Sequence, residues 1–102
     1  MSFKKITAII QREKLEKVEL ALQGLSVSGI SVTYVKGYGN YANFFKSPPL
    51  VSHARIEIFA EELKVEGIVE TILQNAYTGM DGDGIVAVLP VEHFHRIRDK
   101  DN

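Results

Sequence analysis

The chain has 102 residues, of which 45% are hydrophobic and 25% are charged, as in one ordinary globular domain with a single core. Its net charge of −1 argues against a nucleic-acid or acidic-membrane partner, and the absence of cysteine excludes a disulfide framework and a thiol nucleophile. Because no apolar run approaches a membrane span and the N-terminus lacks a signal-peptide pattern, we expect a cytoplasmic protein.

The first part of the chain predicts a strand, a helix and a second strand. Residues 3–10 are rich in β-branched and apolar side chains, which favours a strand. Residues 12–24 carry leucine and valine at helical spacing and end at Gly24, a plausible stop. Residues 28–36 alternate apolar and small polar side chains, as in a half-buried strand.

Residues 37–52 predict a long loop. They include two glycines, two asparagines, the Pro48-Pro49 pair and four aromatic side chains. Long loops in compact domains are usually functional or disordered. The aromatic side chains could stack nucleic-acid bases, but without a basic stripe beside them we favour packing of the loop or docking to a protein partner.

The second part of the chain predicts strand, helix and strand again. Residues 53–60 alternate as a strand, and residues 65–76 form the cleanest amphipathic helical pattern. Residues 85–89 are apolar at every position, which predicts a strand buried on both faces, and residues 90–102 form a polar tail. The order β-α-β-β-α-β predicts an α+β, ferredoxin-like domain over residues 1–102, with a four-stranded antiparallel sheet.

The apolar pattern of the strands also predicts an oligomer. Two helices can cover only one face of a four-stranded sheet, yet the strands carry apolar residues on both faces. The second face should therefore be buried against another copy of the chain.

Residues 78–84 (TGMDGDG) are the most distinctive stretch. Three glycines in six residues can turn backbone N–H groups into a concavity that binds phosphate or another anion. The alternative is a helix C-cap at Gly79 followed by a tight Asp-Gly turn, and spacing alone favours this second interpretation.

The remaining polar candidates predict no catalytic residue and no metal site. Asp81 and Asp83 could ligate a metal, but two carboxylates in a glycine turn are more often turn formers. His93 and His95 are two residues apart and would point to opposite sides of an extended chain, which argues against shared zinc. His53 reads as a hydrogen-bonding residue or a weak pH sensor. No catalytic triad or P-loop motif is present.

Several segments together resemble the PII signal-transduction family over nearly the whole chain. They are KITAII at 5–10, VSGISVTYVKGYG at 27–39, ARIEI at 54–58, TGMDGDG at 78–84, PVE at 90–92 and RIR at 96–98. The resemblance implies a homotrimer with an adenine nucleotide in each cleft between subunits. The implied nucleotide-binding residues are Gly37, Tyr38, Gly39, Thr78, Gly79, Met80, Gly82, Asp83, Gly84, Arg96 and Arg98.

The departures from the family pattern change which nucleotide and which second effector we expect. Met80 and Ile85 stand where the family usually has lysines, so ADP or AMP is expected at least as much as ATP. The long loop is shorter than usual, with Tyr41 in place of a glutamine and His53 in place of a lysine, so 2-oxoglutarate sensing and loop modification are in doubt. Divergent relatives of this kind are associated with inorganic-carbon uptake and transporters, which suggests a small-anion effector such as bicarbonate near Asn40, Tyr41, His53 and Arg55.

The expected function is therefore that of a non-enzymatic regulator. Bound nucleotide would select a conformation of the long loop, which would dock on or release a target, such as a transporter or a carbon-metabolism protein. Two alternatives remain open: a slow metal-dependent nucleotide phosphohydrolase that uses Asp81 or Asp83, and a metal-binding trimer of the same fold.

Overall fold

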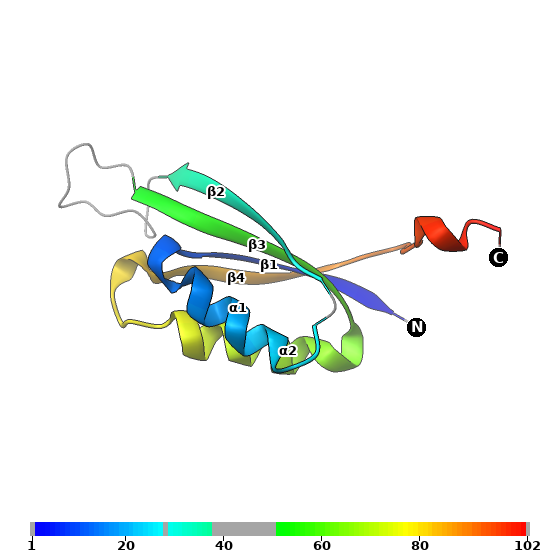
Figure 1. Ribbon diagram of the computed structural model, residues 1–102, viewed down its shortest axis with the longest axis horizontal. Coiled ribbons are helices and arrows are strands. Elements are labelled where there is room, and N and C mark those ends of the chain that lie inside the picture. The colour runs from blue at the N-terminus through cyan, green and yellow to red at the C-terminus, as the bar shows by residue number, and fades with distance from the viewer. Residues whose placement is uncertain (1, 28, 38–50, 102) are drawn as a thin grey trace.

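The computed structural model describes residues 2–27, 29–37 and 51–101 of the chain. Four strands and two helices follow one another in the predicted order β-α-β-β-α-β, with three short 3₁₀ turns between and after them (Figure 1). The elements are β1 (Phe3–Gln11), η1 (Arg12–Lys14), α1 (Leu15–Gln23), β2 (Ser31–Gly37), β3 (Val51–Glu61), α2 (Glu62–Ala76), η2 (Asp81–Asp83), β4 (Gly84–Pro90) and η3 (Ile97–Asp99).

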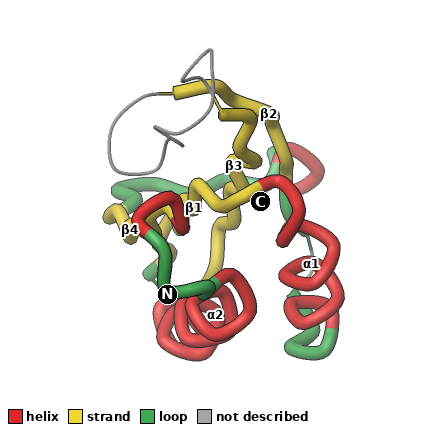
Figure 2. Tube along the Cα trace, turned by 90° about the vertical axis from the view of Figure 1, so that its left-hand side faces the viewer, coloured by secondary structure: helices red, strands yellow, loops and turns green. Residues whose placement is uncertain are grey.

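The four strands form one antiparallel sheet in the order β2-β3-β1-β4. Both helices lie on the same side of this sheet and leave the other face open (Figure 2). The predicted ferredoxin-like βαββαβ fold is therefore confirmed. Neither helix of the described part of the chain has the length and apolar character needed to cross a bilayer.

The core lies between the sheet and the two helices, as the alternation of the strands predicts. Ile6, Ala8 and Ile10 of β1 point toward the helices, and alternate residues of β3 do the same. The helices contribute their apolar stripes at three- and four-residue spacing. The buried core residues are Ile6, Ala8, Ile10, Leu15, Val18, Leu22, Ala54, Ile56, Ile58, Ala60, Ile68, Ile72 and Ala76.

Strand β4 differs from its prediction. It is an edge strand, and Ile85, Val88 and Leu89 are 42–50% exposed in the single chain. The prediction that this strand is buried on both faces is thus wrong for one copy of the chain. A continuous apolar run identifies a strand but does not place it at the centre of the sheet.

The element boundaries differ where the first or last turn lacks apolar side chains. Helix α2 begins at Glu62 rather than residue 65, because its first turn is exposed and carries no periodic signal. The predicted helix over residues 12–24 begins with the 3₁₀ turn η1, and Gly24 is its C-cap as predicted. Strand β2 starts at Ser31 instead of residue 28, and β3 extends from Val51 to Glu61.

Candidate functional site

The glycine loop, residues 77–84, joins α2 to the edge strand β4. Helix α2 ends at Ala76, and Tyr77 is already extended with φ −67° and ψ 131°. The interpretation of Gly79 as the helix C-cap is therefore wrong. Gly79 instead uses its positive φ of 87° within the loop, before the η2 turn over residues 81–83.

The carboxylate of Asp83 organises this loop from within. It accepts hydrogen bonds from the N–H of Thr78 at 2.7 Å and of Gly79 at 2.9 Å, and from the Thr78 hydroxyl. The hydroxyl oxygen in turn accepts the N–H of Met80 at 3.3 Å. Two N–H groups of the loop thus converge on an internal carboxylate, and the expected binding of phosphate or another anion stays a prediction.

The ionised form of Asp83 is stabilised in the folded loop. Burial by itself raises the pKa of Asp83, but the hydrogen bonds from Thr78, Gly79 and Met80 outweigh it and hold the pKa below its ordinary value of 3.8. A lowered pKa means that the folded state favours the carboxylate. Its contribution to stability is therefore present above pH 3.8 and is lost as the pH falls through the lowered pKa.

Replacing Asp83 with asparagine is expected to lower stability by about 1 kcal/mol at neutral pH, since the amide offers only one acceptor oxygen. This corresponds to a fall in Tm of about 4–8 °C for a domain of this size. Thermal unfolding followed from pH 7 downward should show the gap between variant and wild type narrowing below pH 4, where wild type also loses its carboxylate. Asp81→Asn, in the same turn and exposed, is the matched control; an equal loss there would contradict the role of Asp83.

Gly84, the first residue of β4, lies directly against β1. Its φ is 106°, and a Cβ at this position would lie 1.8 Å from the carbonyl oxygen of Ile9. Only glycine allows the loop to enter the sheet at this point. The glycine loop is therefore fixed to the end of β1 where Ile10 pairs with Gly84.

His53 connects the start of β3 to the glycine loop. It is 1% exposed, and its Nε2 lies 3.3 Å from the carbonyl oxygen of Gly82. Since a carbonyl can only accept, this hydrogen bond requires the proton on Nε2. Arg55, two residues further along β3, shares the open face, and its buried Nε has no hydrogen-bond partner among the described residues. The predicted hydrogen-bonding role of His53 is confirmed.

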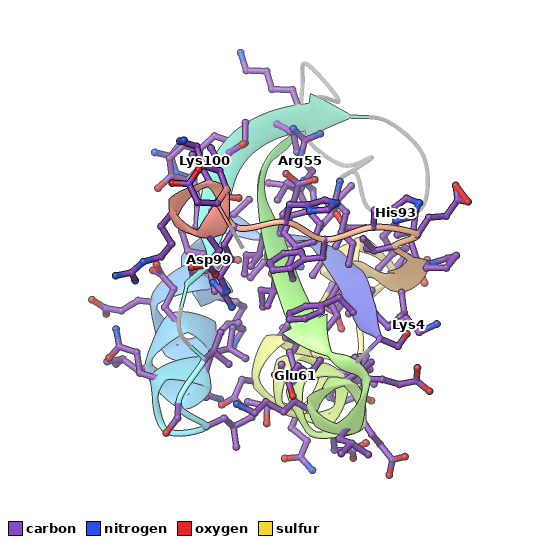
Figure 3. The ribbon with its side chains drawn as sticks, turned by 90° about the vertical axis from the view of Figure 1, so that its right-hand side faces the viewer. Lys4, Arg55, Glu61, His93, Asp99 and Lys100 are labelled. Carbon is purple, nitrogen blue, oxygen red and sulfur yellow. The ribbon has the colours of Figure 1, made fainter. Side chains whose placement is uncertain are left out.

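The two candidate arginines lie at the other end of the sheet. After Pro90, which pairs with Lys4, the tail leaves the sheet past the beginning of β1. The ring of Phe94 stacks on Phe3, with centroids 4.0 Å apart. Figure 3 shows the tail crossing this end of the molecule from His93 to Asp99 and Lys100. The glycine loop is at the opposite end of the sheet (Figure 1).

The separation between the two groups follows from the strand between them. Gly84 pairs with Ile10, and Phe94 stacks on Phe3, seven residues earlier on β1. That length of strand is roughly 23 Å. The structure therefore does not bring Arg96 and Arg98 together with the glycine loop of the same chain.

The open face of the sheet extends between the glycine loop at one end and the C-terminal tail at the other. It carries exposed apolar side chains, including Phe59, Ile85 and Leu89. An ion pair also lies there, with Lys5 Nζ 2.9 Å from the Glu57 carboxylate. The hydrogen bond from Lys5 is the main cause that holds the pKa of Glu57 below its usual value. The face is thus mixed in character rather than purely apolar.

Comparison with known proteins identifies the chain as a whole. The sequence model of the family described as "Nitrogen regulatory protein P-II" matches residues 3–101. This chain belongs to the P-II family.

Individual P-II proteins match over most of their length. The chain is 39% identical to the nitrogen regulatory protein P-II of Azospirillum brasilense, over 93% of this chain and 91% of that protein. It is 38% identical to nitrogen regulatory protein P-II 1 of Methanothermobacter thermautotrophicus, over 95% and 90% of the two chains. Among solved structures, Arabidopsis thaliana PII bound to citrate matches with a TM-score of 0.82 and 32% identity, covering 96% of this chain and 85% of that one. The resemblance to the PII family is confirmed, and with it a general role in regulatory signalling.

Part of the predicted P-II site lies outside the described residues. Tyr38, Gly39, Asn40 and Tyr41 belong to this part, so their assignment stays a prediction. Met80 is described and 66% exposed, and Ile85 is 50% exposed. Both side chains are therefore apolar and open to solvent in the single chain.

Two features of this P-II tail were not predicted. Phe94 lies in residues 90–102, which the sequence predicts as a polar tail, yet its ring packs on Phe3. An aromatic residue among charged ones is the available signal for a packed tail. The expectation that His93 and His95 point to opposite sides is wrong, because their rings stack with centroids 6.3 Å apart. Within the described part of the chain, no three histidine, aspartate or glutamate side chains gather as metal ligands.

Proposed function

We propose that this P-II protein is a regulator that binds an adenine nucleotide in clefts between the subunits of a homotrimer. The observation that carries the proposal is the separation of the glycine loop from the arginine-bearing tail by roughly 23 Å of sheet within one chain. One copy of the chain cannot close such a site. A second copy placed against the open face can bring its tail to the glycine loop of the first.

The chemistry of both groups suits a nucleotide. Arginine guanidinium groups bind phosphate with two parallel hydrogen bonds, and a glycine loop lets a ligand approach the backbone closely. The N–H groups of Thr78 and Gly79 donate to Asp83, and the N–H of Asp83 donates to the carbonyl oxygen of Met80 at 3.1 Å. We therefore propose that phosphate approaches the backbone at Gly82 and Gly84. With Met80 and Ile85 apolar, fewer cationic contacts remain, which favours ADP or AMP at least as much as ATP.

The signal would pass from the glycine loop to the long loop. His53 hydrogen-bonds to Gly82 and stands at the start of β3, directly after residues 37–52. A nucleotide that moves the loop backbone at Gly82 would change this contact, and the altered loop would then dock on or release a target protein. A bicarbonate-sized anion beside Arg55 is the second effector that we propose, since the buried Nε of this arginine has a free donor among the described residues.

Calorimetric titration tests this function directly. The purified protein is titrated with AMP, ADP and ATP, each with and without bicarbonate or 2-oxoglutarate, while light scattering gives the subunit number. We expect micromolar binding of at least one nucleotide at one site per subunit of a trimer. The absence of nucleotide binding would overturn the proposal, and breakdown of the nucleotide over hours would favour a phosphohydrolase instead.

Replacing Arg96 with alanine is expected to weaken nucleotide binding by about 1.5–3 kcal/mol, or about tenfold to 150-fold in Kd, the worth of a charge-assisted contact. The same calorimetric titration measures the change. Lys100→Ala is the matched control, because Lys100 is an exposed cation of the same tail whose ammonium pairs with Asp101 at 3.0 Å. Equal affinities of wild type and Arg96→Ala would contradict the assignment of Arg96 to phosphate.

A further inference from the structure

Three phenylalanines hold the C-terminal tail against the open face of the sheet. The ring of Phe94 lies nearly parallel to that of Phe3, at an angle of 8°, with centroids 4.0 Å apart. Phe59 of β3 completes the cluster, with its centroid 5.9 Å from that of Phe94. Phe3 and Phe59 come from strands β1 and β3, so the tail is anchored to the central pair of the sheet.

The same ring that anchors the tail also contacts Arg96. The guanidinium carbon of Arg96 lies 5.3 Å from the centroid of Phe94, within the range of a cation–π contact. Arg96 is extended, with φ −91° and ψ 129°, and its contact with the ring places the side chains at positions 94 and 96 on the same side of the tail. Beyond Arg96, the η3 turn over residues 97–99 changes the direction of the chain.

We propose that Phe94 is a positioning residue that sets the direction of the Arg96 guanidinium toward the phosphate of a nucleotide held by a neighbouring subunit. This inference rests on the proposed function. It adds that the Arg96 side chain is oriented before the ligand binds. A free arginine side chain samples many rotamers, and fixing it on binding costs affinity. A ring that holds the guanidinium before the ligand arrives removes part of that cost.

The three phenylalanines of the cluster have different roles. Phe3 and Phe59 provide a surface on rigid strands, and Phe94 transmits that rigidity to the tail. Lys5 Nζ lies 6.0 Å from the Phe59 centroid and is paired with Glu57, so it stays on the sheet. Arg96 is therefore the cation that the stack presents from the tail.

The expected effect depends on the presence of phosphate in the ligand. Arg96 is exposed, so Phe94→Ala in the full-length protein should weaken ADP binding by about threefold to fivefold, the upper part of the range of an exposed cation–π contact. Adenosine, which lacks phosphate, should bind both proteins with affinities within about twofold. Phe94→Tyr keeps the ring and should bind ADP like wild type. Ile97→Ala, which changes an 89% exposed residue next to Arg96, is the matched control.

A double-mutant cycle with Arg96→Ala separates positioning from a purely structural role. If Phe94 acts through Arg96, then Phe94→Ala should change ADP affinity by less than about twofold in the Arg96→Ala background. An equal loss in both backgrounds would overturn the inference. Phe94→Leu, which keeps apolar volume but removes the ring, serves the same cycle if Phe94→Ala folds poorly.

Trypsin cleavage gives a readout that needs no nucleotide. Loss of the ring should release the tail and speed cleavage after Arg96 and Arg98, measured by mass spectrometry, whereas Phe94→Tyr should be cleaved like wild type. If wild type binds no nucleotide, the proposed function fails and the inference fails with it. If wild type binds ADP and Phe94→Ala binds it equally well, the inference alone is overturned.

Discussion

Replacing Gly84 with alanine is expected to lower the free energy of unfolding by about 3–5 kcal/mol, or to prevent folding altogether. The new Cβ would lie 1.8 Å from the carbonyl oxygen of Ile9 and 2.8 Å from its carbonyl carbon. Both atoms are backbone of a central strand, so they cannot move aside as a flexible side chain would. The φ of 106° adds strain of its own, because alanine rarely adopts this conformation.

Gly67→Ala is the matched control for this prediction. Gly67 lies within α2, and a Cβ added there would meet nothing within 4 Å. Alanine is the better helix former, so this substitution should raise stability by about 0.5–1 kcal/mol. Urea unfolding of the two variants measures both effects. Equal stability of Gly84→Ala and wild type would contradict the close approach of β4 to Ile9.

The close contact between Gly84 and Ile9 illustrates what the sequence can and cannot predict about the site. Glycine spacing marked residues 78–84 as unusual, and the similarity of the flanking segments indicated the family. The need for glycine at position 84 arises from contact with Ile9, which is distant in the chain, so no local pattern could reveal it. The role of Asp83 in binding the N–H groups of the loop was likewise visible only once the loop was folded.

The fold was predictable to a larger extent because its signals are local. Alternation in β1 and β3 and the helical spacing in α2 indicate which side chains face the core, and the structure buries most of them. Leu73, which belongs to the apolar pattern of α2, is 50% exposed. The position of β4 at the edge of the sheet depends on strand order, which periodicity does not encode. The stack of Phe94 on Phe3 joins opposite ends of the sequence and could not be inferred from either end alone.

The division of the candidate site between the two ends of the sheet has a physical consequence. Under the proposed function, a phosphate held by Arg96 of one copy and by the glycine loop of another would link nucleotide binding to assembly, since neither half is complete alone. Nucleotide should therefore stabilise the assembled form relative to separated chains. The open face, with Phe59, Ile85 and Leu89 exposed, is the surface through which the copies would meet.

Truncating Ile72 to alanine is expected to lower the free energy of unfolding by about 2–5 kcal/mol. Ile72 is fully buried in α2 and belongs to the core cluster between the helices and the sheet. It also borders an apolar recess of about 230 Å³ beneath the glycine loop, together with Tyr77 and Ile85. The cost follows from the lost apolar burial and from the space left where neighbouring atoms do not close in.

Leu63→Ala on the same helix provides the matched control for Ile72→Ala. Leu63 is 92% exposed, so its truncation should change stability by less than about 0.5 kcal/mol. Guanidinium unfolding of both variants measures the difference, and a loss below 1 kcal/mol for Ile72→Ala would show that the recess collapses. A loss of about 2–5 kcal/mol in the free energy of unfolding of Ile72→Ala would mean instead that α2 holds its position when a side chain beneath the glycine loop is removed. The loop would then rest on a rigid support, and changes at Gly82 on ligand binding would be passed to His53 and β3 rather than absorbed by the core.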